Sequence, residues 1–181
     1  MKSLAMNEGN ETGMNQKIIR KLCVSAMLVA LTVILSPFYI PIGASKCFPV
    51  QHLVNVLSAV LLGPWWGVAI AFGASVIRNA MGTGTLLAFP GSMVGALCSG
   101  LMFHYTKKYI PTYLSEVIGG GVLGGLMAYP VAAMLLGRQS AFYAYVIPFL
   151  TSEAGGVIIA ACFIGVLKRT KALDYMRQIL Q

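Results

Sequence analysis

The chain has 181 residues, of which 57% are apolar and only 10% are charged. Soluble domains average about 25% charged residues, and five acidic side chains cannot cover a soluble surface of this size. The four cysteines are far apart and form no CxxC pair, so a disulfide scaffold is excluded together with a soluble enzyme and a disordered tail protein. Composition therefore predicts an integral membrane protein, and about 20 residues per span leaves room for roughly six helices.

The N-terminal residues 1–16 are polar and lack an apolar core, so they are predicted to form a flexible tail. Lys17, Arg20 and Lys21 then precede an apolar run at 22–35, which ends at a Ser-Pro pair. A charged start before an apolar run is also typical of a signal peptide. Because several similar runs follow, we interpret this one as a retained first helix.

The remaining apolar runs predict five more helices. The run from 48 to 81 is broken by Gly63-Pro64, where proline starts a helix more easily than it continues one. It therefore predicts helices at 50–62 and 64–81, the first of them short for a full span. Further helices are expected at 86–105, 113–136 and 142–167. We expect an all-α, six-transmembrane-helix bundle in a membrane domain at 17–170, followed by a tail at 171–181.

The net charge of +8 could indicate nucleic-acid binding. The basic residues lie at the edges of apolar runs, however, which is the placement that the positive-inside rule describes. With both termini in the cytoplasm, only Lys46, Arg78 and Arg138 of the thirteen basic residues fall on the outer side. This asymmetry predicts six spans, both termini cytoplasmic, and no nucleic-acid partner.

Glu153 is the acidic residue predicted to lie deepest in the membrane. A carboxylate at the bilayer centre costs about 2.5–3.5 kcal/mol on insertion scales, so it normally faces a cavity or a partner. Glu153 is therefore a candidate ligand acceptor or proton carrier. The alternatives are an ion pair with Arg78 or a protonated carboxyl that bonds another helix. Glu116 follows Pro111-Thr112 near a predicted helix start, where a carboxylate is expected to be structural.

Other polar residues gather at the outer ends of the predicted helices. Arg78 and Asn79 precede a Gly-Thr-Gly-Thr segment that is typical of a cavity-lining loop, although Arg78 could instead cap its helix or extend to the interface. Gln51, His52 and Asn55 begin the helix at 50–62 on the same side. These three could bind a small polar solute, or Gln51 and His52 could merely cap the preceding loop.

The sequence contains no HExxH, GxSxG, clustered Cys/His or ATPase motif. We therefore expect no enzyme activity, no cofactor and no metal site. Transport by such a chain needs energy from a partner, or from a gradient with Glu153 as the protonation site.

Several segments together resemble the ThiW family, the thiazole-precursor S-components of energy-coupling factor (ECF) transporters. The similarity covers about residues 17–170, and its most specific stretch runs from Arg78 to Ser92. Shorter matches are Phe48–Asn55, Gly63–Gly67, Thr151–Gly155 and the small-residue pair Ala26 and Ala30.

The resemblance implies a multi-pass protein of a prokaryotic plasma membrane that binds a vitamin precursor in an outward-facing pocket. Its implied cargo is hydroxyethylthiazole, used for thiamine salvage. Its implied partners are a transmembrane coupling subunit, contacted through Ala26 and Ala30, and two cytosolic ATPases. Ser25 stands where many members have alanine, and it should still pack in that interface.

A small heteroaromatic cargo needs an aromatic slot and a few placed polar groups. The residues available for this role are Phe48, Phe89, Tyr129, Tyr143 and Tyr145 for stacking, with Glu153, Asn79, Gln51, His52, Asn55, Arg78, Ser92 and Ser152 as polar groups. The alternatives are an S-component for a pyrimidine or for thiamine, a proton-coupled transporter that uses Glu153, and a purely structural membrane subunit.

Overall fold

The computed structural model describes residues 2–42, 45–135, 137, 141 and 143–180. The described chain is helical apart from one short antiparallel hairpin, in which Ile40 pairs with Cys47. Its first half contains α1 (Lys2–Ile34), β1 (Ile40–Ile42), β2 (Ser45–Cys47), α2 (Pro49–Leu61), α3 (Pro64–Ala80) and α4 (Ala88–Thr106). One long helix follows, made of α5 (Tyr109–Glu116), a π-helical segment (Val117–Gly124) and α6 (Gly125–Leu135), and the chain ends with α7 (Val146–Arg169) and α8 (Ala172–Leu180).

Each of the six helices expected from the apolar runs is present, with shifted ends. The fifth begins at Tyr109 rather than at 113, because Pro111 lies in the first turn, where its missing N–H costs nothing. The fourth begins at Ala88 rather than at 86, after a turn that folds back over α3. The expected end at 136 and the expected start at 142 lie outside the described residues.

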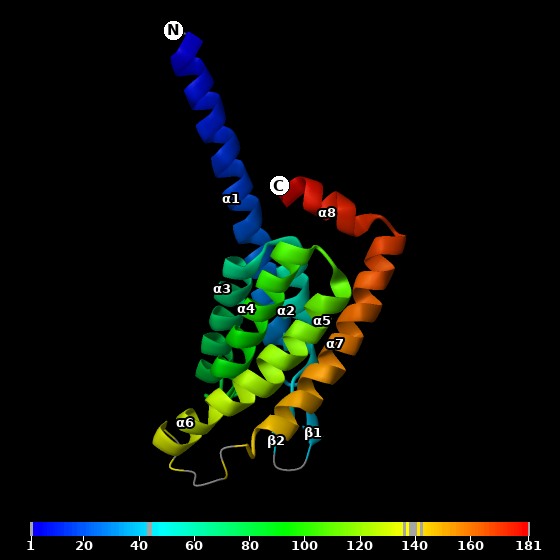
Figure 1. Cartoon of the computed structure of the whole chain (residues 1–181). Helices are drawn as coiled ribbons and strands as arrows, with labels where there is room; N and C mark the ends of the chain where they lie inside the picture. The colour runs from blue at the N-terminus through cyan, green and yellow to red at the C-terminus, as the bar shows by residue number, and fades with distance from the viewer. Residues whose placement is uncertain (1, 43–44, 136, 138–140, 142, 181) are drawn as a thin grey trace.

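The first helix is longer than predicted, since α1 begins at Lys2 and includes residues 2–16, which were expected to form a flexible tail. No proline interrupts this stretch, although its two glycines and three asparagines lower its helix propensity. The N-terminal part of α1 extends beyond the bundle at the same end as the C-terminus (Figure 1). At that end α8 turns back towards α1, where Arg20 Nη1 donates to the Ile179 carbonyl at 3.2 Å.

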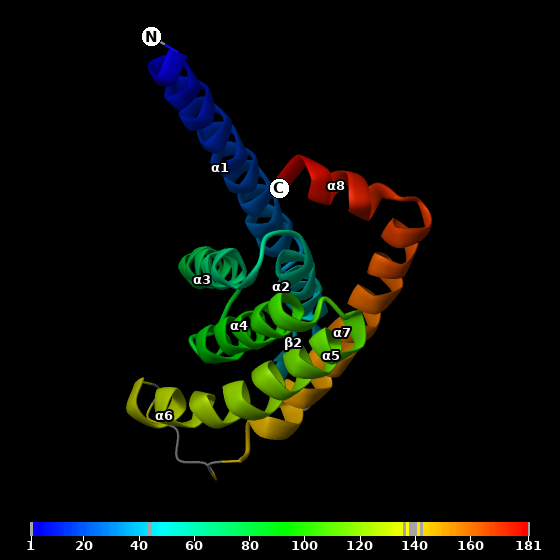
Figure 2. The same cartoon turned by 45° about the horizontal axis from the view of Figure 1, so that its top comes forward.

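Helix α2 is the central helix of the bundle, with α1, α3, α4, α5 and α7 packed around it (Figure 2). Eleven of its thirteen residues are buried, including Val54, Val56 and Val60 of the main core cluster. At about 1.5 Å per residue it is shorter than a hydrocarbon layer of about 30 Å. Because other helices surround α2, it does not face lipid along its length and need not span the hydrocarbon layer by itself.

Close backbone packing between the helices depends on glycine residues at the points of contact. A methyl group on Gly124 would lie 2.5 Å from Gly91 Cα, and one on Gly100 would lie 2.5 Å from Pro64 Cα. Glycine at these positions lets α4 approach the π segment and the start of α3 closely, which is how helices associate in lipid.

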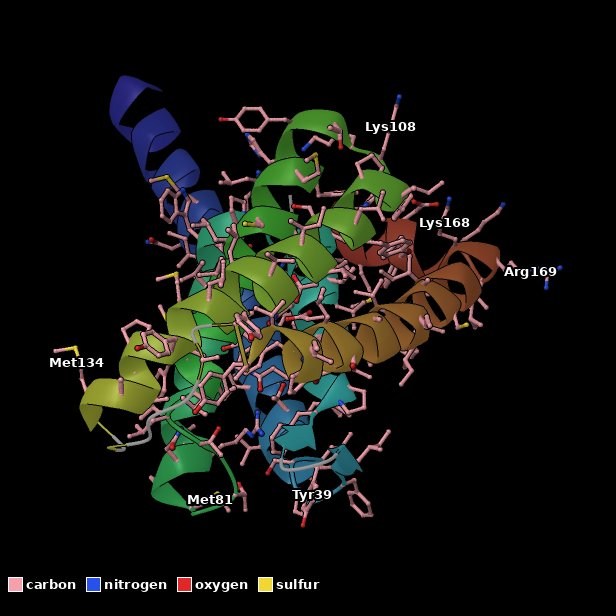
Figure 3. The ribbon with its side chains drawn as sticks, turned by 60° about the horizontal axis from the view of Figure 1, so that its bottom comes forward. Tyr39, Met81, Lys108, Met134, Lys168 and Arg169 are labelled. Carbon is pink, nitrogen blue, oxygen red and sulfur yellow. The ribbon has the colours of Figure 1, made fainter. Side chains whose placement is uncertain are left out.

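The two ends of the bundle differ in charge. Lys108, Lys168 and Arg169 lie at one end, whereas Tyr39, Met81 and Met134 lie at the other (Figure 3). Two described helical stretches, Tyr109–Met134 and Val146–Arg169, are long and apolar enough to cross a membrane, and α2 is a shorter apolar helix. Many exposed side chains of α3, the long helix and α7 are large and apolar, among them Phe72, Ile118, Met127 and Phe163.

Candidate functional site

Arg78 lies in a small pocket at the hairpin end of the bundle, and it is only 1% exposed. Its guanidinium lies over the Phe48 ring, 4.0 Å from the ring centroid, and its Nη1 donates to Gln51 Oε1. Its Nε and Nη2 have no hydrogen-bond partner among the described residues. No described carboxylate lies within 4.0 Å of it, so the ion pair with Glu153, one of the alternatives for that residue, is not formed. The pocket is lined by Thr32, Leu35, Ser36, Phe38, Phe48, Val50, Gln51 and Arg78.

The Gly-Thr-Gly-Thr turn holds the backbone of Arg78 in place. The N–H groups of Thr83 and Gly84 both donate to the Arg78 carbonyl at 2.9 Å. The turn reverses at Gly82, whose φ of +71° favours glycine. Asn79 Nδ2 donates to the carbonyls of Ser75 and Thr85, so this side chain stabilises the turn.

A chain of polar contacts leads from the pocket into the bundle. Gln51 Nε2 contacts Ser75 Oγ at 3.5 Å, and Ser75 Oγ is 3.2 Å from Ser92 Oγ. Asn55 Nδ2 then donates to the Ser92 carbonyl at 3.1 Å and to Glu116 Oε1 at 2.8 Å. The side chains of α2, α3, α4 and α5 are thereby joined.

His52, Glu116 and Glu153 form a buried cluster at the inner end of this chain. His52 Nδ1 lies 2.8 Å from Glu153 Oε2 and 3.7 Å from Glu116 Oε1, and both carboxylates are fully buried. His52 Nε2 lies 3.1 Å from Ser152 Oγ, which also accepts from the Phe48 N–H at 3.2 Å. Because one ligand atom of each cluster residue lies within 4.8 Å of the others, these are the described residues that could hold a metal ion.

Three glycines provide the space for this cluster. A methyl group on Gly95 would lie 2.9 Å from Glu116 Oε1, and one on Gly156 would lie 2.5 Å from His52 Cβ. A methyl group on Gly120 would overlap the Glu153 carboxylate. Gly120 belongs to the π segment, which begins directly after Glu116, and π turns within helices are frequent at functional sites.

The structure brings together most of the residues selected from the sequence. Gln51 and His52 are buried inside the bundle and do not cap the preceding loop. The residues that contact one another in the pocket or the polar chain are Phe48, Gln51, His52, Asn55, Arg78, Ser92, Ser152 and Glu153.

Other selected residues lie elsewhere. Phe89 packs edge-on against Phe72, an exposed residue of α3, with ring centroids 5.9 Å apart. Tyr129 and Tyr145 lie in α6 and just before α7, and their side chains make no polar contact with the cluster in the described part of the chain. On α1, Ala26 and Ala30 are exposed, whereas Ser25 is buried.

Sequence reasoning missed Glu116 as a site residue. It was assigned to a helix start, but α5 begins at Tyr109, which places Glu116 two turns further in. The available signal was Pro111, which is tolerated in the first turn of a helix that starts before it. Ser75, Thr32 and Ser36 were also missed, because single hydroxyls in apolar helices carry no distinctive pattern.

A comparison with protein-family models matches residues 22–170 to the thiamine-precursor transporter protein family, ThiW. The chain belongs to the ThiW family. No curated protein and no solved structure matches it. As a ThiW protein it is a transporter of a thiamine precursor, a small molecule, and it is not assigned to an enzyme family.

Membrane localisation of this ThiW protein fits its arrangement of side chains. Polar groups such as Arg78, Glu116 and Glu153 are buried inside the bundle, while large apolar residues cover its outside. In a bilayer, ionisable side chains face the bundle interior or a cavity for this reason.

Proposed function

We propose that this ThiW protein is the substrate-binding S-component of an ECF-type ABC importer, and that it captures hydroxyethylthiazole for thiamine salvage. The family supports a thiamine-precursor cargo. The pocket at Arg78 lies at the hairpin end of the bundle, opposite the end that carries Lys108, Lys168 and Arg169. Under the positive-inside rule the lysine-rich end is cytoplasmic, so the pocket opens outward.

In this proposal the six-helix bundle spans a prokaryotic plasma membrane and both termini are cytoplasmic. The N-terminal part of α1 and the C-terminal helix α8 lie at the same end of the bundle, which supports an even number of spans (Figure 1). Helix α2 crosses only part of the bilayer, and the hairpin that precedes it lies at its outer end.

The observation that carries the proposal is the pair of unpartnered Arg78 donors beside an aromatic ring. Hydroxyethylthiazole is a small aromatic molecule with a ring nitrogen and a hydroxyl group, both of which accept hydrogen bonds. Arg78 Nε and Nη2 can donate to these acceptors, and the Phe48 ring offers a stacking surface. An apolar and aromatic lining with a few placed polar groups is typical of sites for such ligands.

The remaining candidate residues have supporting roles in this proposal. Gln51 orients Arg78 and offers an amide to the cargo, and Asn79 holds the rim of the pocket. Phe89, Tyr129 and Tyr145 do not line the pocket, and the proposal does not depend on them. The polar groups behind the pocket, which keep its floor in place, are His52, Asn55, Ser92, Ser152 and Glu153.

Energy for uptake comes from partners in this proposal. The chain has no ATPase motif, and Ala26 and Ala30 present a flat exposed face on α1. A small-residue face allows close approach of another helix in lipid. The partners are a transmembrane coupling subunit, which contacts this face, and two cytosolic ATPases.

Two measurements test the function. First, calorimetry and thermal-shift assays on purified protein compare hydroxyethylthiazole with a pyrimidine precursor and with thiamine; we expect only the thiazole to bind. Tighter binding of another precursor would reassign the cargo.

Second, proteoliposomes that contain this chain alone should bind the cargo without accumulating it. Accumulation driven by a pH gradient without ATP would indicate a proton-coupled transporter, and the absence of binding to any precursor would indicate a structural subunit.

A further inference from the structure

We propose that His52, Glu116 and Glu153 together bind one divalent transition-metal ion. The three residues come from three different helices, α2, α5 and α7, and are separated by at least 37 positions in the sequence. Their ligand atoms nevertheless lie within 4.8 Å of one another. Imidazole nitrogen and carboxylate oxygen are the donors that zinc and its first-row neighbours accept together. This cluster lies behind the pocket. The proposed metal ion is separate from the proposed cargo, and the proposal does not depend on the identity of that cargo.

Two carboxylate oxygens of the cluster are left without a partner. His52 Nδ1 and Glu153 Oε2 form an ion pair at 2.8 Å, but Glu116 Oε2 and Glu153 Oε1 have no hydrogen-bond partner among the described residues. Both carboxylates are 0% exposed, so water does not replace the missing donors at the surface. Leaving buried polar groups unpaired costs about 1–3 kcal/mol each, and more when they are charged. A bound cation would satisfy all of these atoms at once.

The charges of the cluster also fit a divalent ion. Two carboxylates converge on one imidazole, and a protonated His52 neutralises only one of them. Arg78 does not compensate, because it lies within 4.0 Å of neither carboxylate. A divalent cation bound by neutral His52 and two ionised carboxylates gives a neutral group, which suits a buried position.

Neighbouring polar groups orient the ligand atoms of the cluster. Ser152 Oγ lies 3.1 Å from His52 Nε2, which fixes the ring with Nδ1 towards the carboxylates. Asn55 Nδ2 donates to Glu116 Oε1 at 2.8 Å and orients that carboxylate. Groups that hold metal ligands in this way are a regular part of metal sites. Three protein ligands leave a coordination position for a water molecule or another small ligand.

The test is metal binding by the purified protein, prepared without a polyhistidine tag and stripped of metal. Titration with Zn²⁺ by calorimetry, and with Co²⁺ by visible absorption, should show one ion per chain. The chain has only two histidines, which provides a matched pair of variants. H52Q should weaken binding by more than the roughly 10–100-fold that is lost when a group supporting a metal ligand is removed. H104Q, which alters an exposed histidine of α4, should bind like the unmodified protein.

E116Q and E153Q keep the shape of the side chains and should each weaken Zn²⁺ binding. Zn²⁺ should raise the thermal unfolding temperature of the unmodified protein and of H104Q, because a ligand stabilises the state that binds it. E153Q should show no such rise, which provides a readout even if H52Q does not fold. The absence of stoichiometric binding to the unmodified protein would overturn the proposal. Equal binding by H52Q, or by both glutamine variants, would overturn it as well.

Discussion

The Glu153 carboxylate on α7 lies directly against the bare backbone of Gly120 in the π segment, with no space for a β-carbon between them. The carboxylate is fully buried and lies 2.8 Å from His52 Nδ1. A buried acid can approach a neighbouring helix this closely only where that helix has no side chain. The position of Glu153 therefore depends on the residue type at 120 as much as on its own side chain.

Gly120→Ala should displace Glu153 and destabilise the protein. A methyl group at this position overlaps the carboxylate, and overpacking a filled core costs about 1–3 kcal/mol. The matched control is Gly155→Ala on α7, where nothing lies within 4 Å of the added methyl group. Thermal unfolding in detergent should show a lower Tm for Gly120→Ala only. An equal Tm for the two variants would contradict the packing described here.

Arg78→Gln should weaken binding of hydroxyethylthiazole by about 10–100-fold, because a hydrogen bond from a charged donor contributes about 1.5–3 kcal/mol. Arg78→Lys should recover only part of the loss, since lysine lacks the planar fork and its stacking. Arg177→Gln is the control, because Arg177 also lies over aromatic rings, those of Phe103 and Tyr109, but at the other end of the chain. Calorimetry would refute the assignment if Arg78→Gln and Arg177→Gln bound equally well.

Asn55→Leu should lower stability by about 1–3 kcal/mol, because it removes the donor to Glu116 Oε1 and to the Ser92 carbonyl. Asn55→Asp should be more harmful, since it places a third carboxylate beside Glu116. Asn15→Leu, at an exposed position of α1, is the control and should change little. The measurement is the unfolding temperature of each variant, and an unchanged value for Asn55→Leu would argue against this link.

Cysteine labelling should reveal the orientation in the membrane. After replacement of the four native cysteines, Met81→Cys places a thiol at an exposed position of the hairpin end, and Lys168→Cys places one at the opposite end. A membrane-impermeant maleimide added to intact cells should label the first variant at once. It should label the second only after the membrane is permeabilised. The reverse pattern would place the termini outside.

Ala26→Phe should leave cargo affinity unchanged and should reduce ATP-dependent uptake by the assembled transporter at least about tenfold. The added ring would fill the flat face of α1 that we assign to the coupling subunit, where close approach needs small residues. Met27→Phe replaces one large exposed side chain by another and should retain uptake. Full uptake by Ala26→Phe would exclude this face as the contact.

The six helices could be predicted because apolar runs and helix-starting prolines act locally. Gly63-Pro64 separates α2 from α3 in the structure as the sequence indicated. The helical conformation of residues 2–16 was not predicted, because polarity shows that a segment avoids the core but does not show that it avoids a helix. The π segment was not predicted either, since its run of glycines is equally compatible with an ordinary helix in lipid.

The site could be predicted where it contains a residue type that is energetically unfavourable inside a membrane. Glu153 was selected because a carboxylate within an apolar run needs a partner, and Arg78 because it lies at the outer end of a predicted helix. An ion pair between the two was one of the alternatives for Glu153. The structure pairs Glu153 with His52 and places Arg78 beside Gln51 and Phe48. Such pairings depend on how helices rotate and slide against one another, which the period of apolar residues does not fix.

The π segment determines which way α6 faces. In an α-helix, residues four positions apart are rotated by about 40° more than a full turn. A row of residues with this spacing therefore winds gradually around the helix. In the wider turns of a π-helix, residues four positions apart are rotated by less than a full turn. The row of residues there winds in the opposite direction. The long helix therefore keeps one buried stripe along its length, at Thr112, Glu116, Gly120, Gly124, Ala128 and Ala132. Ala128 follows Glu116 by twelve residues, about one more than three α-helical turns need, so the π segment accommodates one extra residue and sets the rotational register of α6.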